Sequence, residues 1–170
     1  MKFTSQLAWI CLFIASLILN GCSDSESMSK AQSNKDVLRQ TASVEQNKIK
    51  DEMIAKYKRA IELNPNDAEA HYFLGLTYYT KGALDDAIAE LQTSLRLNPD
   101  NAKNNGRLRL TADAHYNLAC AYSLKNEKAQ AIRHLGQAIR LNPGYIRGAQ
   151  MDPDLSDIKD SKEFQTLVKK

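Results

Sequence analysis

Two histidines occupy matching places in the chain and are its first candidates for chemistry. His71 lies in the segment AEAHYFLGL, and His115 lies in the segment ADAHYNLAC. An imidazole side chain can bind a metal ion or act as a general base near neutral pH. A metal site also needs a carboxylate or a thiol at ligand spacing, and the sequence places none there. We therefore expect both histidines to pack inside the protein, without a metal or another cofactor.

Cys120 and His134 are the remaining candidates. Cys120 could act as a redox thiol or as a weakly polar filler, and both interpretations stay open. His134 is expected to be exposed to solvent. The chain has no serine or cysteine beside a histidine in a nucleophile motif and no glycine-rich phosphate loop, so an enzyme is not expected. The alternative, a redox or metal-dependent protein, would rely on Cys120 or on His71 with His115.

These residues belong to a 34-residue unit, 68–101, that returns at 112–145. Neighbouring matched positions lie three and four apart, which places them on one stripe of each of two helices. The small residues at two positions allow the two helices of a unit to approach closely. The matched residues of the first unit are His71, Leu74, Gly75, Tyr78, Ala87, Leu91, Ser94 and Pro99. Those of the second are His115, Leu118, Ala119, Tyr122, Ala131, Leu135, Ala138 and Pro143.

Turn residues separate the helices of each unit. Gly82 is expected to end the first helix, and Asn126 has the same role in the second unit because asparagine tolerates a left-handed backbone. Pro99 and Pro143 cannot continue a helix, so each closes its unit. Asn66 or Asp67 is expected to cap the helix that runs to about residue 81.

This pattern, H-x2-L-[GA]-x2-Y followed by Ala, Leu and Pro, resembles the tetratricopeptide repeat. The resemblance implies an all-α fold in which antiparallel helical hairpins stack as a short right-handed α-solenoid. It also implies a groove that the first helix of each repeat lines. The resemblance implies no reaction chemistry. The positions that would line this groove are Glu69, Tyr72, Leu76, Tyr79, Asp113, Tyr116, Cys120 and Ser123.

The groove would be aromatic and apolar with an acidic edge, which suits a protein or peptide segment with apolar anchors. The lysine and asparagine of a carboxylate clamp are absent, since Tyr72 and Leu76 take the places of the first pair and only Asn117 agrees. A second interpretation stays open, in which residues 36–63 or the C-terminal tail fill the groove. Basic and acidic residues number 23 and 20, without clustering, so nucleic acid is not an expected partner.

The N-terminal 21 residues have the features of a secretory signal. An apolar stretch from Leu7 to Leu19 would span about 20 Å as a helix, which is short for a bilayer core of about 30 Å. It ends in Leu-Asn-Gly-Cys, which resembles the bacterial lipoprotein box and implies cleavage before a lipidated Cys22. An ordinary signal with a chance cysteine, or an uncleaved anchor, is the alternative. Ser23 implies transfer to the periplasmic face of the outer membrane.

The remaining segments would connect or cover the repeats. Residues 22–35 are polar and predict a flexible tether. Residues 36–67 predict a helical segment, either one long or broken helix over the first repeat or a degenerate repeat. Residues 102–111 predict a solvated loop, or a partner-contacting loop with Lys103, Arg107 and Arg109, and residues 107–111 could lengthen the following helix. Residues 146–170 predict a C-terminal cap with a capping box from Asp160 to Glu163.

Together these features predict a protein-binding adaptor, tethered by lipid in the bacterial cell envelope, that holds or assembles an envelope complex. A soluble chaperone adaptor with the same repeats is the other alternative, and it would require residues 1–21 to remain attached.

Overall fold

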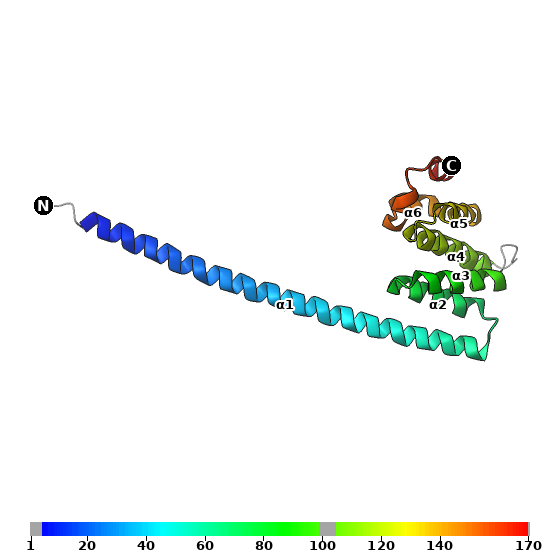
Figure 1. Ribbon diagram of the computed structural model, residues 1–170, viewed down its shortest axis with the longest axis horizontal. Helices are drawn as coiled ribbons and strands as arrows, with labels where there is room; N and C mark the ends of the chain where they lie inside the picture. Colours follow the sequence, from blue (N-terminus) through cyan, green and yellow to red (C-terminus); the bar gives the residue numbers. More distant parts are fainter. Residues whose placement is uncertain (1–4, 99–104, 170) are drawn as a thin grey trace. The chain divides into compact units, whose positions relative to one another are not determined.

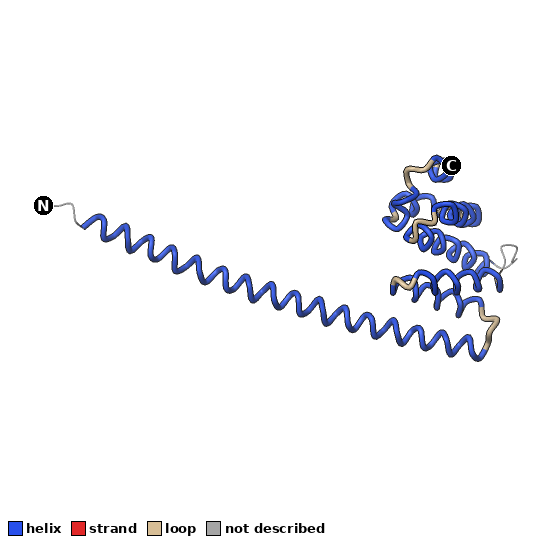
Figure 2. Tube along the Cα trace, viewed as in Figure 1, coloured by secondary structure: helices blue, strands red, loops and turns tan. Residues whose placement is uncertain are grey.

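The computed structural model describes the backbone of residues 5–98 and 105–169, and the side chains of residue 30 and of residues 32–98 and 109–169. Within these ranges the chain forms helices and no strand, so the all-α prediction is confirmed (Figures 1 and 2). The elements are α1 (Ser5–Leu63), α2 (Ala68–Lys81), α3 (Leu84–Leu97), α4 (Asn105–Leu124), α5 (Lys128–Leu141), α6 (Tyr145–Met151), η1 (Pro153–Ile158) and α7 (Lys162–Val168).

The chain divides into two units, residues 1–47 and residues 48–170. In the first unit α1 continues through residues 22–35, where the sequence predicts a flexible tether. That prediction is wrong in the structure, and the physical reason is that residues 22–63 contain neither glycine nor proline to interrupt a helix. Large apolar side chains of this unit, such as Leu38, are exposed.

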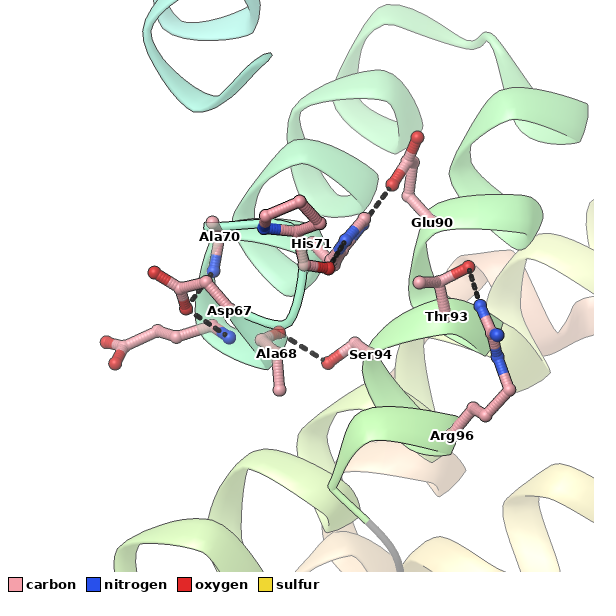
Figure 3. A network of polar contacts seen from close by, with 10 residues as sticks. Asp67, Ala68, Ala70, His71, Glu90, Thr93, Ser94 and Arg96 are labelled. Carbon is pink, nitrogen blue, oxygen red and sulfur yellow. Dashed lines mark hydrogen bonds and ion pairs between the residues drawn. The ribbon is translucent and has the colours of Figure 1, made fainter. Parts of the chain in front are cut away.

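In the second unit, α2 and α3 form the first helical hairpin. Asp67 caps α2, and its carboxylate accepts hydrogen bonds from the backbone N–H groups of Glu69 and Ala70, both at 3.0 Å (Figure 3). Gly82 ends α2 with a φ of 77°, the left-handed conformation predicted for it. The hydroxyl of Ser94 on α3 donates to the carbonyl of Ala68, 2.7 Å away, which ties the two helices together.

Close packing within this hairpin explains its small residues. A Cβ atom at Gly75 would lie 2.8 Å from the Cγ of Leu91 and 3.1 Å from the carbonyl oxygen of Ala87. Leu91 and Ala87 are themselves fully buried. The glycine therefore lets α2 and α3 approach more closely than a larger residue would allow.

The second hairpin, α4 with α5, repeats this arrangement. Asn126 ends α4 with a φ of 59°, as predicted from its alignment with Gly82. Ala119, Ala131 and Leu135 are fully buried between the two helices, and α5 ends at Leu141 shortly before Pro143. Pro99, at the matching place in the first repeat, lies outside the described residues.

The two hairpins stack through α3 and α4, and the tail packs on the second hairpin at the end of the stack (Figure 1). Residues 48–63 of α1 lie against α2, where the ring of Tyr57 stacks on Phe73 with centroids 5.5 Å apart. The ammonium of Lys50 also donates to the carbonyl of Thr80 at 2.7 Å. Both alternatives for residues 36–67, a helix over the first repeat and a degenerate repeat, stay predictions. The insertion lengthens the following helix, since α4 begins at Asn105, and Lys103 lies outside the described residues.

The C-terminal cap is built from α6, η1 and α7. η1 contacts both α4 and α5, and α7 contacts α5 and α6. Leu155, Ile158 and Phe164 are buried against the repeats. The predicted capping box from Asp160 is wrong by one residue, because Ser161 has the extended backbone of a cap and its hydroxyl accepts from the N–H of Phe164 at 3.2 Å.

Candidate functional site: the concave surface of the leading helices

The leading helices of the two repeats, α2 and α4, are in contact and form one surface. The amide of Asn117 on α4 donates a hydrogen bond to the hydroxyl of Tyr72 on α2, 3.2 Å away. This bond joins the side chains of the two helices, and Tyr72 is the residue of the predicted groove that takes part in it. We use the name concave surface, after the groove that the sequence predicts, for the surface formed by Glu69, Tyr72, Leu76, Tyr79, Asp113, Tyr116, Cys120 and Ser123.

The C-terminal tail covers α4 and the C-terminal end of α2 on the concave surface. The hydroxyl of Tyr116 donates to a carboxylate oxygen of Asp152 at 2.8 Å. The hydroxyl of Tyr79 donates in the same way to Asp154. Pro153 separates these two acidic residues, so the segment presents two carboxylates to two tyrosines. The interpretation in which the tail fills the groove therefore describes the second repeat and the Tyr79 end of α2.

Exposure differs along the concave surface. Ser123 and Cys120 are 0% and 2% exposed, and Tyr72 is 8% exposed. Glu69 is exposed, and the side chains of Leu76 and Asp113 are partly accessible. The expectation that all eight residues face a partner needs correction, because the tail and neighbouring helices bury several of them. The accessible part lies mainly on α2.

Tyr145 contacts the same surface, and the sequence predicts no separate role for it. Its ring stacks on Tyr116 with centroids 4.5 Å apart, and its hydroxyl donates to the carboxylate of Asp113. Tyr145 begins α6, so this contact fixes the direction in which the tail leaves the second repeat. A tyrosine directly after the closing Asn-Pro-Gly of the repeat is the only sequence signal that pointed to it.

The buried environment of the concave surface controls its titratable groups. Burial, and then the hydrogen bond to a carboxylate, raises the pKa of both Tyr79 and Tyr116 well above the ordinary value. Burial and the nearby Asp152, whose carboxylate lies 3.6 Å from the sulfur, likewise raise the pKa of the Cys120 thiol. The thiol therefore stays protonated and is a poor nucleophile, which favours the role of a weakly polar filler.

The histidines pair across each hairpin. His71 is buried as predicted, and its Nδ1 donates to the carboxylate of Glu90 at 2.6 Å (Figure 3). His115 is also buried, and its Nδ1 lies 2.9 Å from the Nδ1 of His134. The expectation that His134 is solvated is wrong. It occupies the place on α5 that Glu90 has on α3, which faces the leading helix.

The described residues offer neither a cluster for a metal ion nor a membrane-spanning helix. Within them, histidine, cysteine and acidic side chains do not gather in threes at a place that could hold a metal ion. The described helices also include none whose length and apolar character would let it cross a bilayer.

Comparison with protein families identifies the repeats. The family described as TPR repeat matches residues 45–82, and tetratricopeptide repeat families match residues 68–101 and 112–145. These ranges together include more than half of the 170 residues. No curated protein matches the chain. The helical pairs, their left-handed turns and these matches agree, and the chain belongs to the tetratricopeptide repeat family.

Proposed function

We propose that this protein is a lipid-anchored adaptor of the bacterial cell envelope, which holds a partner polypeptide on its concave surface. Tetratricopeptide repeats support a role in protein–protein interaction, and proteins built from them are generally scaffolds without enzymatic activity. The hydrogen bond between Asn117 and Tyr72 is the observation that carries this proposal. It joins the two repeats into one continuous surface on which a segment could lie.

The partner would bind mainly at the N-terminal part of α2, because the tail lies on α4 and on Tyr79 near the end of α2. Glu69 supplies an exposed negative charge there, and Leu76 supplies a partly accessible apolar side chain. Asp113 on α4 adds a second carboxylate, which also accepts a hydrogen bond from Tyr145. An extended or helical segment with apolar anchors and a basic residue would match this chemistry.

Charge reversal tests this surface. Glu69→Lys combined with Leu76→Asp should weaken binding of an isolated partner at least tenfold, since it removes an apolar contact and reverses the local charge. Lys128→Glu, a charge reversal at an exposed position of α5, is the matched control and should leave the affinity unchanged. Equal affinities of the double variant and the control would refute the proposed surface.

The lipid anchor is proposed from the sequence that precedes and includes Cys22. Cleavage before this cysteine would make it the new N-terminus and allow acylation of its thiol. Replacing Cys22 by Ala should then release the protein from membranes and abolish incorporation of labelled palmitate. Membrane association that survives in this variant, without acyl label on the natural protein, would show that the anchor is wrong.

The outer membrane is the proposed destination because Ser23 follows the anchor. A Ser23→Asp variant should stay in the inner membrane when the two membranes are separated by density. A Ser23→Ala variant is the control and should fractionate with the natural protein. If all three proteins distribute alike, residue 23 does not direct their sorting.

A further inference from the structure

The two repeats carry different polar pairs at the same structural place. His71 and His115 are matched residues of α2 and α4, and Glu90 and His134 are matched residues of α3 and α5. The first repeat therefore joins its helices through a histidine and a carboxylate, and the second through two histidines. A carboxylate can compensate a positive imidazolium, whereas a second imidazole cannot.

The atoms around His71 can accept a hydrogen bond from either ring nitrogen. Its Nδ1 faces the carboxylate of Glu90 at 2.6 Å, and its Nε2 faces the carbonyl oxygen of Pro65 at 3.2 Å. Both partners are hydrogen-bond acceptors, so a doubly protonated ring would satisfy both. The first repeat therefore offers an acceptor to each ring nitrogen of its histidine.

The surroundings of His134 have the opposite character. Its Nδ1 faces the Nδ1 of His115 at 2.9 Å, and its Nε2 lies 3.5 Å from the guanidinium Nη2 of Arg133. The ring also stacks on Tyr122, with centroids 5.4 Å apart, and the Tyr122 hydroxyl accepts from Gln92 on α3. Among the described side chains, the titratable and charged groups facing His134 are His115 and Tyr122 from α4 and Arg133 from α5, and these three include no carboxylate.

This geometry assigns the proton positions of the neutral pair. Because Nε2 of His134 faces a cationic donor, it is best placed as an acceptor, which leaves the hydrogen on Nδ1. Nδ1 of His134 then donates to Nδ1 of His115. A proton added at Nε2 would lie against the Arg133 guanidinium, inside a hairpin where both histidines are less than a tenth exposed.

We propose that the His115–His134 pair is an acid-sensitive latch, which opens the contact between α4 and α5 at low pH while the first repeat stays closed. η1 packs on both α4 and α5, so the opening would also loosen the C-terminal cap over the concave surface. Such a latch would expose the second repeat's part of that surface in an acidic envelope.

The direction of the pH dependence follows from the folded and unfolded states. Burial, with the charges of His115 and Arg133, lowers the pKa of His134 to about 4, against an ordinary value near 6.5. The unfolded chain therefore binds more protons than the folded one between these two values. The stability of the neutral pair is fully present above about pH 6.5 and is lost as the pH falls toward 4.

Hydrogen exchange of the full chain tests the latch. Between pH 7 and pH 5, the protection factors of amides in α4 and α5 should fall roughly tenfold more than those in α2 and α3. His134→Glu rebuilds the pair of the first repeat and should abolish this difference, and the neutral variant His134→Gln should do so as well. The reciprocal variant Glu90→His should transfer the acid sensitivity to α2 and α3.

Two results would overturn the proposal. One is an equal loss of protection in both repeats of the natural protein, which would indicate a general effect of acid. The other is an acid response in α4 and α5 that persists in folded His134→Gln and His134→Glu, because neither variant retains the histidine pair.

Discussion

Tyr116 donates a hydrogen bond to Asp152 over 2.8 Å, and this bond joins the concave surface to the tail that follows the second repeat. The two residues come from different parts of the chain, the middle of α4 and the residue after α6. Asp152 also caps η1, since its carboxylate accepts from the N–H of Asp154 at 3.0 Å. One carboxylate thus both begins η1 and holds it on α4.

Removal of this hydrogen bond should measurably destabilise the protein. Tyr116→Phe leaves the carboxylate of Asp152 without its tyrosine partner, and we expect a loss of about 1–2 kcal/mol in the free energy of unfolding. Tyr57→Phe is the matched control, because Tyr57 contacts Phe73 through its ring, which the variant keeps. This variant should change the free energy of unfolding by less than about 0.5 kcal/mol. Urea denaturation followed by circular dichroism measures both. Equal losses in the two variants would contradict a role for the bond.

The buried side chains of the tail should contribute more than its polar contacts. Leu155 is fully buried, so Leu155→Ala is expected to lower the free energy of unfolding by about 2–5 kcal/mol through the cavity that it leaves. Met151 is 73% exposed, and Met151→Ala should change the free energy of unfolding by less than about 0.5 kcal/mol. Thermal melts of the two variants give the comparison. A mild Leu155→Ala phenotype would show that the tail is not an integral cap.

Two glycines should respond oppositely to replacement by alanine. At Gly75 the added Cβ would lie 2.8 Å from Leu91 Cγ, so Gly75→Ala should cost about 1–3 kcal/mol by forcing α2 and α3 apart. At Gly136, inside α5, the nearest atom to such a Cβ is Leu167 Cδ2 at 3.5 Å, which is ordinary contact. Gly136→Ala should therefore stabilise the protein by about 0.5–1 kcal/mol through helix propensity. Destabilisation of similar size at both positions would contradict the packing described.

Local features of the sequence predicted the fold well. Gly82 and Asn126 end their helices because a left-handed residue is a property of the turn itself, independent of distant contacts. The small residues at the hairpin contacts were also predictable, since spacing by three and four residues fixes which side chains share a face.

Contacts between distant segments were less predictable. His134 lies three residues after Ala131 and four before Ala138, so its spacing placed it on the buried stripe, but its polarity suggested solvent. A buried histidine needs a partner, and the pairing with His115 could be found only by placing α5 against α4. The hydrogen bonds from Tyr116 to Asp152 and from Tyr79 to Asp154 also have no local signal in the sequence. Exposed and buried aspartates look alike in a sequence.

Crosslinking in intact cells tests most directly whether the concave surface on α2 holds a partner. A photo-reactive amino acid at position 76 should capture one main polypeptide, and Glu69→Lys in the same chain should abolish that product. The same probe at position 128 on α5 should not capture it. Equal capture from both positions, or a product at position 76 that is insensitive to Glu69→Lys, would contradict the account.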